Sequence, residues 1–263
     1  MMDKQIDVFC TALRLYTRIP CPKSNGTSQS NINKAIRFFP LIGWIVGGLS
    51  FLLFYTAFFL LNVEIAVFVS LIAGVLLTGG IHEVGLSNVF DRLAKDFKEG
   101  RGAETEKNKR IGVFGGVALL LVLALKYFSL YQIITYIGLE NRGLIALIFI
   151  SYHSIARLVA LNFFFTTTYS QANRLSKVKT IAKDYPFKDV ELAYLFGLLP
   201  LAALSFYDWK YWLILIPLFF VYYLSKRLYE KCLDGFTEDC LGATQQIAEC
   251  ATLIAYLMIW KFM

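Results

Sequence analysis

Residues 76–92 read LLTGGIHEVGLSNVFDR, and the rest of the chain is organised around this stretch. An apolar run ends there in two glycines and a His-Glu pair. Val84, Asn88 and Asp91 then follow at spacings of four and three residues, which places them on one face of a helix. Polar side chains beside a membrane-embedded apolar run are costly and usually functional, so we interpret them as a variant metal-and-phosphate site at a membrane boundary.

The composition is that of an integral membrane protein. Of the 263 residues, 57% are hydrophobic and 17% are charged, whereas soluble domains are usually about 45–50% apolar and about 25% charged. The mean hydropathy is +0.56. The net charge of +7 fits basic cytoplasmic loops better than nucleic-acid binding, so we expect no nucleic-acid partner. Five cysteines without a C-x-x-C pair predict free thiols and no zinc site.

The apolar segments predict an all-α, polytopic membrane protein with about seven transmembrane helices, because each can cross much or all of the hydrocarbon layer. We expect the whole chain, 1–263, to be a single integral-membrane domain. Residues 1–38 are predicted to form an interfacial segment with a short amphipathic helix over 7–16. The predicted spans are 39–61, 65–80, 112–138, 144–169, 192–206, 211–224 and 247–260.

The charge distribution predicts the orientation. With seven spans, the amino-terminal stretch and the long loops 81–111, 170–191 and 225–246 fall on one side. The short turns all fall on the other side. Because the long loops are rich in Lys and Arg, the positive-inside rule places them in the cytoplasm and the carboxyl terminus outside. We therefore expect a multi-pass protein of the cell (inner) membrane.

The first candidate site comprises His82, Glu83, Asn88 and Asp91. Carboxylates spaced along one helix face can hold Mg²⁺ against a diphosphate, because hard cations prefer oxygen ligands. The alternative interpretation is a solvated helix end with an ordinary charge pattern.

The second candidate is Arg110 with Gly112, at the start of a span. A guanidinium and free backbone N–H groups there can bind phosphate. The alternative is that Arg110 anchors the span at the interface and the glycines allow close helix packing.

The third candidate is the polar stretch DGFTEDCLGATQQ over 234–246, just before the last predicted span. Glu238 and Asp239 can reach a metal or a ribose hydroxyl from there. Taken alone, the stretch favours a capped helix entry with Thr237 or Asp239 as the N-cap.

A fourth group lies inside a predicted span and includes His153 and Arg157. A guanidinium is costly in lipid, so Arg157 should face the interior of the bundle. We interpret His153 as a core histidine whose hydrogen bonds are satisfied.

Taken in order, several motifs resemble the cobalamin synthase family, the adenosylcobinamide-GDP ribazoletransferases. They are RLYTRIPCP, FFPLIGWIVGG, TGGIHEVGLSNVFD, KRIGVFGG and DGFTEDCLGATQQ, and they cover nearly the whole chain. The resemblance implies a Mg²⁺-dependent phosphotransferase of the late cobalamin pathway. It would join α-ribazole, or its 5′-phosphate, to adenosylcobinamide-GDP and release GMP. These two substrates and the lipid bilayer are the expected partners, and an oligomer is compatible with the sequence.

The candidate groups and the resemblance together give a set of expected site residues. The expected catalytic residues are Glu83, Asp91, Arg110 and Asp239, of which Glu83, Asp91 and Asp239 are also the expected metal ligands. The expected substrate-binding residues are His82, Asn88, Asn108, Gly112, Thr237 and Gln246.

At three positions this chain lacks an Asp of the family pattern. Val84, Asn88 and Asn108 stand where the pattern has Asp, and each change removes a charge and a metal ligand. The departures therefore predict weaker Mg²⁺ binding. They leave open the alternative of a catalytically impaired homologue that binds corrinoid or nucleotide, or that acts as a partner protein. A transporter is disfavoured because the polar residues gather on one predicted face rather than at the midplane.

Overall fold

The structure is a computed structural model that describes residues 2–21, 29–99, 111–167, 185–233 and 235–262. Throughout these ranges the regular structure is helical, and no strand occurs in them. The elements are α1 (Met2–Tyr16), α2 (Gln29–Ala35), the 3₁₀ helix η1 (Ile36–Phe38), α3 (Phe39–Leu60), α4 (Val63–Thr78), α5 (Ile81–Glu99), α6 (Val113–Ile137), α7 (Arg142–Thr166), α8 (Phe187–Leu204), the 3₁₀ helix η2 (Trp209–Ile214), α9 (Leu215–Leu233) and α10 (Glu238–Lys261).

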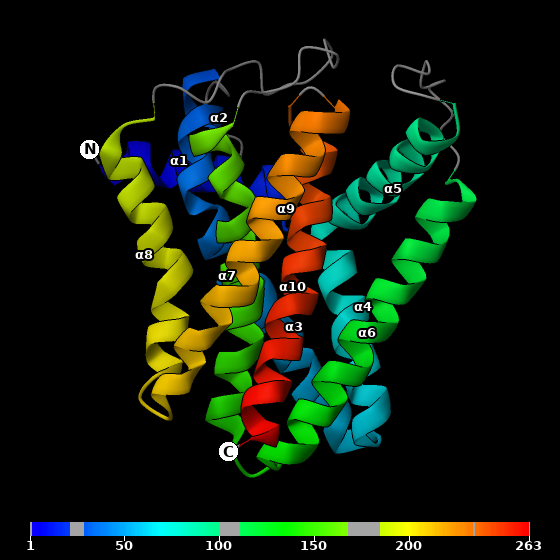
Figure 1. Cartoon of the computed structure of the whole chain (residues 1–263). Helices are drawn as coiled ribbons and strands as arrows, with labels where there is room; N and C mark the ends of the chain where they lie inside the picture. The colour runs from blue at the N-terminus through cyan, green and yellow to red at the C-terminus, as the bar shows by residue number, and fades with distance from the viewer. Residues whose placement is uncertain (1, 22–28, 100–110, 168–184, 234, 263) are drawn as a thin grey trace.

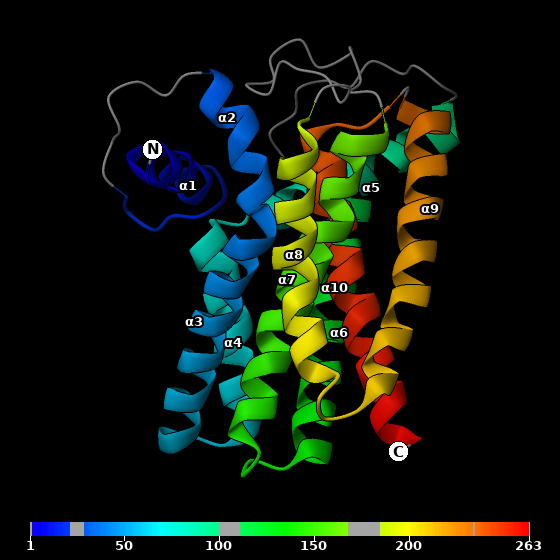
Figure 2. The same ribbon diagram turned by 90° about the vertical axis from the view of Figure 1, so that its left-hand side faces the viewer.

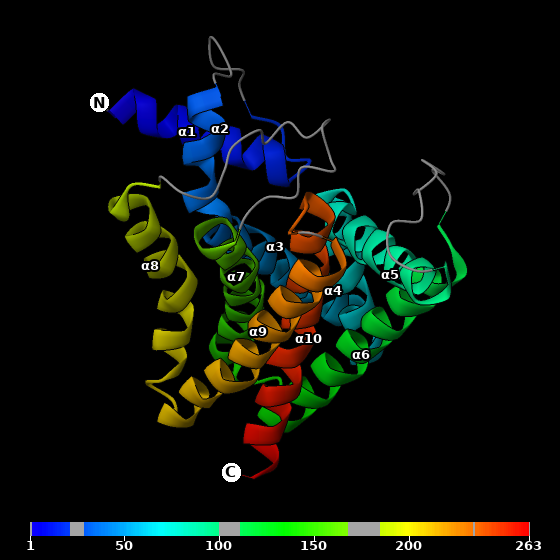
Figure 3. The same cartoon turned by 45° about the horizontal axis from the view of Figure 1, so that its top comes forward.

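The long helices run side by side along one direction, with α7 and α10 near the middle (Figures 1 and 2). Helix α1 lies across one end of this bundle (Figure 2). Helix α5 is oblique and packs between α10 and the start of α6 (Figure 3). The turns from α3 to α4, from α6 to α7 and from α8 to η2 lie at the opposite end, with the carboxyl terminus (Figure 1). The three predicted short turns therefore lie together at one end, and the assignment of the other end to the cytoplasm stays a prediction.

The multi-pass helical membrane class is confirmed, whereas the number of seven spans is not. Among the described residues, four helical segments are long and apolar enough to cross a membrane, and counting the bent pair α4–α5 as one span gives up to five. They are Asn31–Leu60, Val113–Ile137, Arg142–Thr166 and Trp209–Leu233. Composition alone does not identify α8 and α10 as spans, because charged and polar residues occupy the first part of each.

Two predicted loops are wrong in their extent. Helix α9 continues to Leu233 and α10 begins at Glu238, so most of the predicted loop 225–246 is helical. Helix α5 likewise occupies much of the predicted loop 81–111. The polar residues of α10 explain the error: Thr244, Gln245 and Gln246 are buried against other helices and not in solvent. The amphipathic helix predicted over 7–16 is α1, which begins earlier, at Met2.

Small residues allow α3 and α7 to pack closely. A Cβ atom on Gly43 would lie 2.7 Å from the backbone oxygen of His153, and one on Gly47 would lie 2.5 Å from that of Phe149. Two small residues four apart on one helix face are a common device for close contact between membrane helices. This approach fixes the middle of α7, where the fourth candidate group is located.

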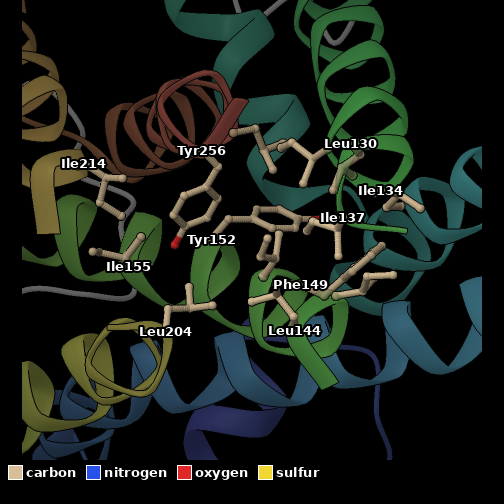
Figure 4. Packing of buried hydrophobic residues seen from close by; sticks show 14 of the residues in the cluster. Leu130, Ile134, Ile137, Leu144, Phe149, Tyr152, Ile155, Leu204, Ile214 and Tyr256 are labelled. Atoms are coloured by element: carbon tan, nitrogen blue, oxygen red, sulfur yellow. The ribbon is translucent and has the colours of Figure 1, made fainter. Parts of the chain in front are cut away.

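Aromatic and aliphatic side chains fill the core between α7, α10 and their neighbours (Figure 4). Phe149 and Tyr152 of α7 lie with ring centroids 6.1 Å apart. The hydroxyl of Tyr256 is 2.9 Å from the Ser151 hydroxyl, so this polar tip is satisfied within the core. Because lipid tails are as apolar as these side chains, close packing is the main contribution of this cluster to stability.

Candidate functional site

The polar stretch begins at a sharp corner between α4 and α5. Gly79 and Gly80 have φ angles of 69° and 70°, a left-handed conformation that glycine adopts without a Cβ clash. The two helix axes differ by 88° across this corner. His82 and Glu83 follow directly and are buried in the bundle, with 5% and 8% of their surface exposed.

Helices α5 and α10 cross at two glycines. A Cβ atom on Gly85 would lie 2.8 Å from the backbone oxygen of Asp239. One on Gly242 would lie 3.0 Å from the backbone oxygen of His82. Because no side chain separates the two backbones, the residues on either side of the crossing can contact each other directly.

A chain of hydrogen bonds starts at Glu83. The side-chain amide of Gln246 donates to Glu83 Oε1 at 2.8 Å. The amide oxygen of Gln246 accepts a hydrogen bond from the Lys126 ammonium group, which also donates to Glu249. Lys126 is on α6, so this chain links α5, α10 and α6 inside the bundle.

Glu249 is the centre of a buried charge network. Its carboxylate lies 3.1 Å from His153 Nδ1, 3.7 Å from the Arg157 guanidinium and 3.1 Å from the Gln245 amide nitrogen, in addition to its pair with Lys126. Arg157 is 1% exposed. The prediction that Arg157 faces the interior is confirmed, and His153 is buried with its Nδ1 against Glu249. Burial makes each charge here depend on its partners, because an unpaired buried charge is strongly destabilising.

A small chamber lies between this network and the α4–α5 corner. Its volume is about 20 Å³, which is room for about one water molecule. His82, Glu83, Lys126 and Glu249 are among its lining residues. Four buried polar atoms of the lining have no hydrogen-bond partner among the described residues: His82 Nε2, Glu83 Oε2, Arg157 Nε and Gln245 Oε1. Unpaired buried polar atoms are costly, so the chamber suits one small polar molecule.

Asp91 caps the first turn of α6. Its Oδ2 accepts a hydrogen bond from the backbone N–H of Gly112, and its Oδ1 accepts one from that of Gly115, both at 2.8 Å. The N–H of Gly112, predicted for substrate binding, is therefore bound to Asp91 in this structure. A negative side chain at this place also interacts favourably with the helix dipole.

We predict that replacing Asp91 with Ala lowers the free energy of unfolding by about 1–2 kcal/mol, because the first turn of α6 loses its cap. Thermal unfolding of the detergent-purified protein measures the effect. Asp91→Asn keeps one oxygen acceptor and should lose less. Equal melting temperatures for wild type and Asp91→Ala would show that the cap contributes nothing.

Asn88 joins α5 to α10 nearer the end of the bundle. Its amide nitrogen donates to Asp239 Oδ2 at 3.2 Å. A carboxylate at position 88 would face Asp239 with like charge, so asparagine replaces a repulsion with a hydrogen bond. Thr237 is the N-cap of α10, since its hydroxyl accepts from the backbone N–H of Cys240, as predicted for this helix entry. Val84 is half exposed on the surface of α5.

The structure thus distributes the predicted site residues over three places. His82, Glu83 and Gln246 meet at the chamber, Asn88 meets Asp239, and Asp91 meets Gly112. Asn108 and Arg110 lie outside the described residues.

The three predicted magnesium ligands do not form a metal-binding group among the described residues. Among the described residues, no three His, Cys, Asp or Glu side chains are placed to hold a metal ion. Glu83, Asp91 and Asp239 each bind a different partner. The described side chains therefore do not fit a magnesium ion as they stand, and no step below passes through a metal.

Lys126 and Glu249 hold the network together, although neither is among the site residues predicted from the sequence. Lys126 lies within the predicted span 112–138. The signal was present, because an ionisable residue inside a membrane span is a functional candidate by default.

Comparisons with known proteins agree with the resemblance. The family model described as Cobalamin-5-phosphate synthase matches residues 8–257. The adenosylcobinamide-GDP ribazoletransferase of Shewanella amazonensis is 32% identical over 98% of this chain and 97% of its own. Proteins of the same name from Leptospira interrogans and Vibrio cholerae are 33% and 31% identical, over 99% and 98% of this chain and 98% and 95% of their own. No solved structure matches.

Proposed function

The chain belongs to the cobalamin-5-phosphate synthase family, and from this premise we propose that it joins α-ribazole, or its 5′-phosphate, to adenosylcobinamide-GDP with release of GMP. The extent of the family match carries the proposal. Residues 8–257 include every side chain of the chamber and of the α5–α10 crossing. The relatives are named adenosylcobinamide-GDP ribazoletransferases, and the chain matches them along nearly their full length. No comparison favours an impaired homologue or a transporter.

The reaction needs a proton acceptor. As a hydroxyl of ribazole attacks the phosphorus nearest the cobinamide, the bond to GMP breaks and the hydroxyl loses its proton. Three carboxylates near the crossing are candidates. Asp91 uses both oxygens to cap α6, and Asp239 binds Asn88. Asp239 also keeps one oxygen beyond its bond to Asn88, but only Glu83 has a buried oxygen at the chamber with no partner among the described residues, so we assign the proton to Glu83 through one water molecule.

The other predicted residues have supporting roles in this proposal. His82 lies next to Glu83 on the chamber and also has an unpartnered ring nitrogen. Asn88 is exposed beside Asp239, where both side chains can form hydrogen bonds with ribose or phosphate oxygens. We also propose that the protein lies in the inner membrane with its long connections in the cytoplasm, and that the two substrates are its small-molecule partners.

The proposal is tested by GMP release. Detergent-purified protein is incubated with adenosylcobinamide-GDP and α-ribazole, and GMP is quantified by chromatography. We expect release that requires both substrates. Chelation by EDTA in the same assay tests the predicted requirement for Mg²⁺. No GMP release, with the Shewanella amazonensis relative active under the same conditions, would contradict the proposal.

A further inference from the structure

We propose that Lys126 is a positioning residue for this transfer: it orients the Gln246 amide, and the oriented amide holds the Glu83 carboxylate against the chamber. The inference rests on the proposed function, because it concerns the proton acceptor of that reaction. It adds two buried residues of α6 and α10 that act through Glu83 without touching the substrate.

The first step is the orientation of the amide. A lysine ammonium group can only donate hydrogen bonds, so the atom of Gln246 that faces Lys126 must be the oxygen. The NH₂ group is then turned toward Glu83, to which it donates at 2.8 Å. Without Lys126, the amide could rotate and place its oxygen against the carboxylate, where the two acceptors would repel each other.

The second step is the fixation of Lys126 itself. The lysine is 4% exposed and binds Glu249, which lies three residues after Gln246 and therefore on the same face of α10. One ammonium group thus bridges two successive positions of this face. Glu249 is held in turn by His153 and Arg157 of α7, so the network of three helices restrains the lysine.

The third step is the effect on Glu83. The amide of Gln246 binds Oε1 of Glu83, while Oε2 has no partner in the part of the chain that the structure describes. The hydrogen bond therefore decides which way the free oxygen points. A misplacement of about 1 Å at a reacting group can cost about 100-fold in rate. Because Lys126 is only 4% exposed and acts on Glu83 through Gln246, the loss should fall on kcat and not on KM.

The test compares Lys126→Met, Gln246→Leu and the double variant by steady-state GMP release. Each single variant should lower kcat by about 10- to 100-fold, with KM for both substrates changed by less than about twofold. The kcat of the double variant should be no lower than that of the more impaired single variant, because both substitutions break the same chain of contacts. Lys210→Met is the matched control. Lys210 pairs at 3.6 Å with the partly buried Asp208, in the turn from α8 to η2 at the short-turn end (Figure 1), and the variant should keep the wild-type kcat.

The outcomes separate the inference from the proposed function. Gln246→Leu leaves the Lys126–Glu249 pair intact, so it decides the matter if Lys126→Met does not fold. Wild-type kcat in Gln246→Leu, or losses that multiply in the double variant, would overturn the inference while wild-type turnover upholds the function. A wild-type protein that releases no GMP would overturn both.

Discussion

Replacing Glu83 with glutamine is expected to lower kcat by about 100- to 10,000-fold, the usual contribution of a positioned acid–base group. The fold should be preserved, because a glutamine has the same shape and its amide oxygen can still accept the hydrogen bond from Gln246. The amide cannot take up the proton of the attacking hydroxyl, however. Initial rates of GMP release at saturating substrate, measured across pH, check the prediction. The acidic limb of the wild-type profile, where the carboxylate becomes protonated, should be absent from the variant.

Glu64→Gln is the control for this experiment. Glu64 is at the start of α4, where it accepts a hydrogen bond from the Tyr131 hydroxyl at 3.3 Å, at the short-turn end of the bundle. The same chemical change there should leave kcat unaltered. A Glu83→Gln variant whose kcat stays within about threefold of wild type would rule out Glu83 as the proton acceptor and would move attention to Asp239.

Replacing Glu249 with alanine should lower the free energy of unfolding by about 3–5 kcal/mol, more than any other substitution proposed for this protein. The side chain is 2% exposed and is the carboxylate to which Lys126, Arg157 and His153 are all oriented. Its removal leaves two buried cations without their shared counter-ion. Equilibrium unfolding in detergent, followed by circular dichroism, measures the change.

A double-mutant cycle with Lys126→Met tests the cause of this loss. If unpaired buried charge is responsible, Glu249→Ala combined with Lys126→Met should be less destabilised than the sum of the two single variants. Glu230→Ala, which removes an exposed pair with Lys226 at 3.9 Å, should cost at most about 1 kcal/mol. Additive losses in the cycle, or a Glu249→Ala protein as stable as Glu230→Ala, would show that the network is not held together by charge.

Much of the fold could be predicted from the sequence, because long apolar segments indicate membrane-spanning helices. Helices α3, α6 and α7 fall close to the predicted spans 39–61, 112–138 and 144–169. The first half of α10 could not be predicted in this way. Its polar residues are buried by α5 and α6, so a hydropathy pattern assigns them to a loop when they are part of a helix interior.

The candidate site was only partly predictable. The polar residues of α5 stood out because they follow an apolar run and share helical spacing. Their partners did not, because Asn88 and Asp239 are 151 positions apart and Asp91 and Gly112 are 21 apart. Such pairs depend on where helices cross, which the glycines at 85 and 242 decide in three dimensions. For the same reason Lys126 is an isolated charge in the sequence, and only the fold brings Glu249 beside it.

The most direct test of the proposed transfer is the mass of the product. Wild-type protein incubated with adenosylcobinamide-GDP and isotopically labelled α-ribazole should yield one labelled corrinoid, of the mass of the joined molecule, for each GMP released. Hydrolysis of the nucleotide without incorporation of ribazole would contradict the transfer. Unchanged substrates beside an active Shewanella amazonensis relative would contradict it equally.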